Sequence, residues 1–67
     1  MPNENVTWVG YMEAEQLSSF SRKTLRRLLR NGQLRARKIG GEMTIDKRSL
    51  AKYMRDRGYA QQLRLFD

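Results

Sequence analysis

The sequence contains no cysteine and no histidine. The absence of cysteine excludes disulfides and thiolate metal ligands, and the absence of histidine excludes imidazole ligands and nucleophile–histidine pairs. No stretch approaches the roughly 18 apolar residues that span a membrane, and the opening segment lacks the charged and apolar regions of a signal peptide. We therefore expect a cytoplasmic protein that binds no cofactor and no metal and does not associate with a membrane.

Acidic residues are also scarce, with seven Asp and Glu against fourteen Lys and Arg and a net charge of +7. Ten of the fourteen cations are Arg, whose planar guanidinium suits bidentate contacts with phosphate and guanine. This composition fits either a nucleic-acid partner or a well-solvated surface. The distribution of the cations has to distinguish between the two.

A chain of 67 residues can form one small domain, which buries only about 60% of its unfolded surface. We found no internal repeat and no linker. The expected organisation is a leader at residues 1–7, a domain at 8–58 and a tail at 59–67. The mixture of helical and strand-like patterns within the domain predicts an α+β fold.

The first ordered segment is "VTWVGYM", residues 6–12, which is rich in β-branched and aromatic types. It predicts a short strand or an extended lead-in, from which Trp8 or Tyr11 packs onto the core. Acidic residues in the following turn favour a helix dipole, so we expect a short helix over residues 13–19 with Leu17 turned inward.

The segment "RKTLRRLLRNG" predicts an amphipathic helix over residues 22–31. Ser21 is suited to the N-cap and Gly32 to the C-terminal end. Leucines three and four residues apart form one stripe, and the cations gather on the opposite side. This helix therefore has one packing face and one cationic face.

The segment "QLRARKIGGEMTID" predicts a β-hairpin around Gly40–Gly41. A two-residue loop would pair Ile39 with Glu42. Ile39 would then lie on the opposite face from Met43 and Ile45. A loop of three residues would place these apolar side chains on one face, so the hydrophobic pattern favours the longer loop.

Asp46 is suited to capping a last helix, which Gly58 ends. Its basic residues are interpreted mainly as solvated surface charges, one or two of which could contact a nucleic-acid backbone: Lys47, Arg48, Lys52 and Arg55. Met12, Met43 and Met54 are interpreted as fillers of gaps in a small core. The predicted core comprises Leu17, Phe20, Leu25, Leu28, Leu29, Ile39, Ile45, Leu50, Tyr53 and Met54.

Two helices joined by about two residues, the second of them basic, form a helix-turn-helix arrangement whose second helix enters the major groove of DNA. A hairpin directly after it can serve as a wing along the backbone or in the minor groove. The recognition helix would contribute Ser21, Arg22, Lys23, Thr24, Arg26, Arg27 and Arg30. The wing would contribute Arg37, Lys38, Gly40 and Gly41.

Residues 8–58 resemble the small excisionase-type winged helix-turn-helix family, which is related to the DNA-binding domain of MerR regulators. The resemblance rests on "SRKT" before the second helix, "RNGQL" after it, "KIGG" and "IDKRSLAKY". It implies binding of double-stranded DNA without a cofactor, and the family includes excisionases, activators and replication proteins. Excisionases bend attachment-site DNA and direct an integrase towards excision.

Three residues depart from the pattern of that family. Glu42 stands where a basic wing residue is common, and its carboxylate would repel phosphate at the tip of the hairpin. Ser19 stands where glycine often forms the turn between the helices. Glu13 stands where Thr or Ser often caps the first helix.

Catalysis is not expected from this sequence. Glu13 and Glu15 are two residues apart and diverge on a helix, no hydroxyl has a candidate base, and the phosphate-binding glycine motifs are absent. We therefore predict a binding protein rather than an enzyme.

The tail ends in "QLRLF", residues 62–66. Gln62, Leu63, Leu65 and Phe66 resemble the pentapeptide by which bacterial proteins dock on the replicative sliding clamp. The same apolar side chains could instead pack onto the domain itself, onto a neighbouring copy on DNA, or onto an integrase. All four interpretations of the tail stay open.

The sequence thus predicts a site-specific DNA-binding protein of a phage or mobile element. An excisionase is the favoured role, and transcriptional regulation is a further one. The rival hypothesis is an adaptor or inhibitor that docks on a replication protein such as the clamp through its tail.

Overall fold

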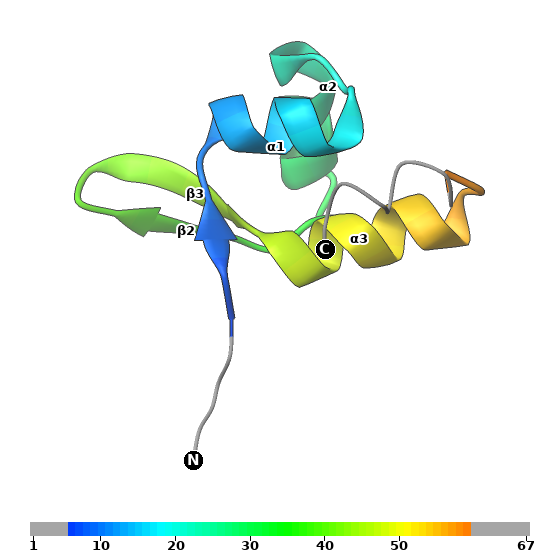
Figure 1. Ribbon diagram of the computed structural model, residues 1–67. Coiled ribbons are helices and arrows are strands. Elements are labelled where there is room, and N and C mark those ends of the chain that lie inside the picture. Colours follow the sequence, from blue (N-terminus) through cyan, green and yellow to red (C-terminus); the bar gives the residue numbers. More distant parts are fainter. Residues whose placement is uncertain (1–5, 60–67) are drawn as a thin grey trace.

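The structure, a computed structural model, describes residues 6–59 and contains three helices and one antiparallel sheet. In chain order these elements are β1 (Trp8–Val9), α1 (Tyr11–Ser18), α2 (Arg22–Arg30), β2 (Ala36–Ile39), β3 (Glu42–Asp46) and α3 (Lys47–Asp56). Helices α1 and α2 lie together on one side of α3, and the β2–β3 hairpin projects from the body (Figure 1). The predicted α+β class is confirmed. No helix in this described part is long and apolar enough to cross a membrane.

Helix α1 begins two residues earlier than predicted, at Tyr11. Gly10 adopts an extended conformation at the N-cap, and its carbonyl accepts the Ala14 N–H at 3.0 Å. Tyr11 therefore belongs to the helix, where it is half-buried and packs against the core as predicted. The helix ends at Ser18, and the C-cap residue Ser19 has a φ of +64°, a left-handed conformation unusual for a residue other than glycine.

Helix α2 confirms the prediction to within one residue. The Ser21 hydroxyl accepts the Thr24 N–H at 3.2 Å and caps the N-terminus. At the other end, Gly32 has a φ of +74° and the Gln33 N–H donates to the Leu28 carbonyl at 2.9 Å. This bond satisfies a carbonyl that the helix leaves open, as in a Schellman motif.

The hairpin has a two-residue loop, so the predicted three-residue loop is wrong. Ile39 pairs with Glu42, and φ is +60° at Gly40 and +85° at Gly41. Two successive positive φ angles are typical of tight hairpin turns that match strand twist. The hydrophobic pattern misled because the tip extends past the core: Ile39 is 46% exposed and Met43 38% exposed.

The core lies between the three helices and strands β1 and β3. Its buried apolar residues are Val9, Ala14, Leu17, Leu25, Leu28, Leu34, Ile45, Leu50 and Met54. Ile39 was wrongly predicted to belong to it, whereas Val9 and Leu34 were not foreseen. Met54 fills the core as predicted, but Met12 is 69% exposed, so the interpretation of Met12 and Met43 as gap-fillers is wrong.

The sheet has the order β1-β3-β2, and its central strand leads directly into α3. Buried Asp46 caps α3 by accepting the Arg48 N–H at 2.9 Å, and its own N–H donates to the Arg35 carbonyl at 2.8 Å. The Lys47 N–H donates to the Thr7 carbonyl at 2.9 Å. These bonds fix the hairpin relative to the helices.

Candidate nucleic-acid interface

Helix α2 divides its residues between the core and a cationic surface. Leu25 and Leu28 are buried, and Leu29 packs partly buried against the core. The exposed side carries Arg22, Lys23, Arg26, Arg27 and Arg30, which line one shallow hollow together with Thr24. The structure therefore brings together six of the seven residues predicted for the recognition helix.

The seventh residue, Ser21, lies at the N-terminal edge of this surface. Its hydroxyl accepts the Thr24 N–H and donates to Thr24 Oγ1 at 3.1 Å. Both hydroxyls are therefore engaged in capping α2, and the structure gives them a role in starting the helix at this point. Ser21 is exposed and Thr24 half-buried.

The turn between α1 and α2 is three residues long and is anchored by Phe20. The Phe20 ring meets the Tyr53 ring at a centroid distance of 6.2 Å and the Tyr59 ring at 5.3 Å, both edge to face. This aromatic contact ties the two-helix unit to α3 and sets how α2 is presented.

Arg22 of α2 contacts two side chains of α1. Its Nε donates to Glu15 Oε2 at 3.0 Å, and its guanidinium lies over the Tyr11 ring at 5.1 Å from the centroid. Sequence reasoning missed both partners. They lie on the preceding helix and meet Arg22 only because the turn folds α1 against α2, so helical periodicity gave no signal.

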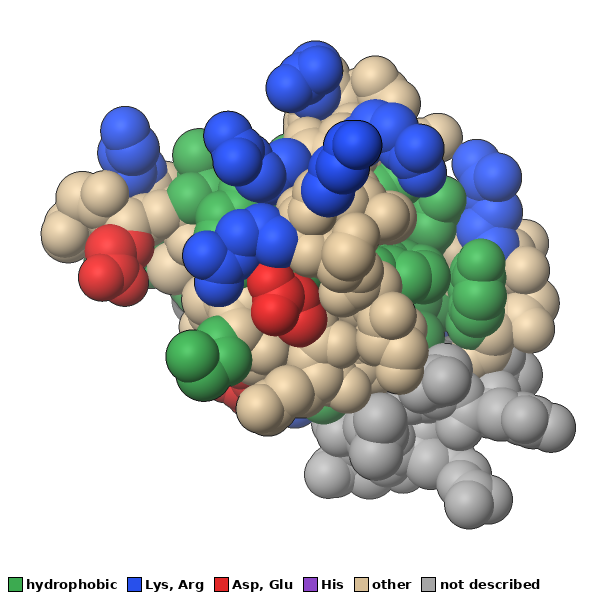
Figure 2. Space-filling view, turned by 90° about the horizontal axis from the view of Figure 1, so that it is seen from above, with side chains coloured by type: hydrophobic (Ala, Val, Ile, Leu, Met, Phe, Trp, Pro, Cys, Tyr) green, Lys and Arg blue, Asp and Glu red, His purple; other side chains and the backbone are tan. Residues whose placement is uncertain are grey.

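The hairpin presents its two predicted cations on opposite faces. Arg37 pairs with Thr44 and Lys38 with Met43, and adjacent residues of a strand point to opposite sides. Seen from above, cationic side chains gather over α2 and also stand on the hairpin, where an acidic side chain accompanies them (Figure 2). At most one of the two hairpin cations can therefore face the same side of the molecule as the cations of α2.

The predicted wing glycines, Gly40 and Gly41, serve the turn. A Cβ built on either would meet no atom within 4 Å, so space does not require glycine there. The positive φ angles at both positions favour it.

The cations of α3 form a separate group that does not line the hollow on α2. Arg48, Lys52 and Arg55 lie along a different part of the surface. Lys52 pairs with Asp56 at 3.0 Å, and Arg57 stacks on the Tyr53 ring at 5.0 Å. Part of the positive charge of α3 and of its C-cap residue Arg57 is thus engaged by side chains of α3 itself.

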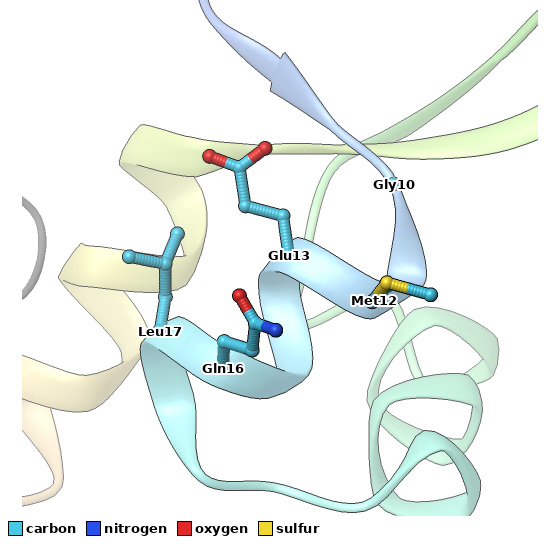
Figure 3. Close-up of a pocket in the computed structure, with 5 residues that line it drawn as sticks. All are labelled: Gly10, Met12, Glu13, Gln16 and Leu17. Carbon is cyan, nitrogen blue, oxygen red and sulfur yellow. The ribbon is translucent and has the colours of Figure 1, made fainter.

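A further open hollow runs along the outer side of α1. Figure 3 shows Glu13, Gln16 and Leu17 on the same side of the helix, with Met12 pointing away from them. Among the described residues that line it, Glu13 alone has an ionisable side chain. Within residues 6–59 no group of acidic side chains could hold a metal ion.

The predicted partner-binding residues of the tail, Gln62, Leu63, Leu65 and Phe66, lie outside the described residues.

Comparison with known proteins gave one match. A family model described as a helix-turn-helix domain, of a family that includes excisionase-like DNA-binding proteins, matches residues 13–58. The matched range covers α1 from residue 13, the turn, α2, the hairpin and α3. No curated protein and no solved structure matches the chain.

Proposed function

Because this chain belongs to the helix-turn-helix domain family, which makes it a DNA-binding protein, we propose that it recognises specific double-stranded sites through α2. One observation carries the proposal: the cationic side of α2 is exposed while its leucine side is buried in the core. A helix anchored in this way can enter the major groove while its contacts with the core stay intact.

The positions along α2 suggest a division of labour. In helix-turn-helix proteins the first turns of the second helix reach base edges. Arg22, Lys23 and Arg26 are so placed, and we assign them to base edges or the adjoining phosphates. Arg27, which points about 100° around the helix from Arg26, and Arg30, in the last turn, are assigned to the phosphate backbone. Neither assignment requires a catalytic group, and we propose a binding protein rather than an enzyme.

The hairpin is proposed as an auxiliary contact with the backbone. Arg37 and Lys38 are exposed and give the hairpin positive charge. Glu42 sits opposite Ile39 at the tip, where its carboxylate opposes close approach to phosphate. We therefore propose that the flank of the hairpin contacts DNA and that its tip does not enter the minor groove.

The central test compares Arg26→Ala with Arg55→Ala, two substitutions that remove the same charge from α2 and from α3. A duplex selected by the protein from a random-sequence library serves as the probe. Arg26→Ala should weaken binding about 5-fold or more, since a direct contact with a base or phosphate is worth about 1–3 kcal/mol. Arg55→Ala should change binding less than about 2-fold. Equal effects of both substitutions would contradict the assignment of α2 as the helix that contacts DNA.

For the biological role we propose an excision directionality factor of a phage or mobile element that bends attachment-site DNA, and the resemblance to excisionases supports this proposal. One domain of this size covers few base pairs, which favours several copies binding side by side, with an integrase as a further partner. A genome-wide footprint tests the role. Sites beside an attachment region support it, whereas promoter sites indicate transcriptional regulation and an origin indicates replication control.

A second candidate function rests on the sequence "QLRLF", which resembles a sliding-clamp docking peptide. Two apolar anchors, Leu65 and Phe66, could fill a preformed pocket while Gln62 hydrogen-bonds at its rim. The test measures binding to a purified bacterial clamp by the intact protein and by a Leu65→Ala, Phe66→Ala double variant. Equal binding, or no binding by either, removes this candidate.

A further inference from the structure

Arg22 is restrained by two residues of α1 although it stands at the start of the DNA-facing helix. Its Nε lies 3.0 Å from Glu15 Oε2, and the side chains are 54% and 32% exposed. Tyr11 supports the flat side of the guanidinium at 5.1 Å from the ring centroid. A hydrogen bond at one edge and an aromatic ring at one face together fix the plane of the guanidinium.

These contacts leave most of the hydrogen-bonding capacity of Arg22 unused. A guanidinium has five N–H groups, and the bond to Glu15 uses the one on Nε. Within residues 6–59 the two terminal nitrogens have no hydrogen-bond partner. They form the fork that binds a pair of acceptors in a bidentate contact.

We propose that Glu15 and Tyr11 are positioning residues that hold Arg22 ready for a bidentate contact with DNA. This inference rests on the proposed function, in which α2 contacts DNA. The acceptor pair has one of two sources, the two free oxygens of a phosphate or the N7 and O6 atoms of a guanine in the major groove. Holding the fork in place beforehand removes part of the entropy cost of ordering a long side chain on binding.

The charge of Glu15 on its own acts in the opposite direction. A carboxylate near the interface repels phosphate, so removing it should tighten binding to any DNA through long-range electrostatics. The two effects separate by comparison with Glu13, which carries the same charge on the same helix. Glu13 points away from α2 (Figure 3) and forms no ion pair in the described part of the chain.

The experiment compares Glu15→Gln with Glu13→Gln in the full chain, using a duplex selected by the unaltered protein from a random-sequence library and a scrambled duplex of equal length. Relative to Glu13→Gln, we expect Glu15→Gln to bind the selected duplex about 3- to 30-fold more weakly, part of the roughly 5- to 150-fold that a bidentate contact is worth. Tyr11→Leu should act in the same direction. A loss no larger than that of the control overturns the inference.

The same pair of substitutions is then made in an Arg22→Ala background. If Glu15 acts through Arg22, the two substitutions now have equal effects, because nothing remains to be positioned. A Glu15→Gln loss that persists in this background overturns the inference, since Glu15 would then act through the fold or by direct contact. Circular dichroism of each variant checks that the helices are retained.

Comparison of the two duplexes separates the two acceptor sources. A guanine contact predicts that Glu15→Gln weakens the selected duplex more than the scrambled one, and that 7-deazaguanine in the selected site reproduces the loss. A phosphate contact predicts equal losses on both duplexes, reproduced by a methylphosphonate linkage. If neither modification lowers the affinity of the unaltered protein in an Arg22-dependent manner, the bidentate contact is excluded.

Failure of this inference is distinguishable from failure of the proposed function. If the unaltered protein selects no duplex and its binding does not depend on salt, both fail together. If it selects a duplex and requires Arg26 while Glu15→Gln matches Glu13→Gln, only the positioning role is overturned.

Discussion

The ring of Tyr59 lies edge to face against the ring of Phe20, with centroids 5.3 Å apart and planes at 82°. The Tyr59 N–H also donates to the Met54 carbonyl at 2.8 Å, which closes the C-terminal end of α3. Phe20 belongs to the turn between α1 and α2. One residue beyond Gly58 therefore links the end of the last helix to the helix-turn-helix unit.

Tyr59→Ala should lower the free energy of unfolding by about 1–2 kcal/mol, because it removes an aromatic pair worth about 0.5–1.5 kcal/mol beyond its buried area. Tyr59→Phe keeps the ring and should lie close to the unaltered protein. Urea denaturation followed by circular dichroism measures both. Equal loss in the two variants would show that the hydroxyl, and not the ring contact, stabilises this end of α3.

Burial predicts contrasting effects for two apolar residues, one in the loop before the hairpin and one at the tip of the hairpin. Leu34→Ala should cost about 2–4 kcal/mol, since it opens a cavity at a buried side chain. Ile39→Ala should cost less than about 1 kcal/mol, because Ile39 lies on the exposed side of the tip. Thermal unfolding of the two variants at one pH checks this. A large cost at Ile39 would contradict the two-residue loop.

The sequence predicted α2 and α3 well because both have local signals at their ends, whereas α1 has no side-chain N-cap and begins two residues earlier than predicted. Ser21 and Asp46 cap α2 and α3 as expected, and Gly32 takes the left-handed conformation that ends α2. Buried leucines and exposed cations follow from helical periodicity alone, so the candidate interface on α2 could also be predicted. These features depend only on residues a few positions apart.

Features that depend on contacts between distant segments could not be predicted from the sequence. Leu34 lies in an irregular loop without periodicity, so its burial follows only from the packing around it. Ile39 is apolar yet extends past the core, which the pattern alone could not show. The Glu15–Arg22 pair joins two helices across a turn, and its formation depends on how they pack.

The left-handed conformation of Ser19 predicts that glycine is strongly preferred over β-branched residues at this position in the turn between α1 and α2. Glycine adopts a φ of +64° without steric cost, whereas a β-branched side chain there is strained. Ser19→Val should therefore be less stable than Ser19→Gly by more than about 1 kcal/mol. Chemical denaturation of the two variants provides the comparison. Similar stabilities would mean that the turn can adopt another conformation.

Salt dependence tests whether cations of α2, and not those of α3, contact phosphates. Each phosphate contact contributes about one unit to the slope of log affinity against log salt. Arg30→Ala, on the exposed side of α2, should reduce that slope by about one. Arg48→Ala removes the same charge from α3, outside the hollow lined by α2, and should leave the slope unchanged. Fluorescence anisotropy with a labelled duplex between about 50 and 200 mM salt covers the informative range. A reduced slope for Arg48→Ala would show that the DNA path extends onto α3, since a cation that only solvates the surface releases no counterions from DNA.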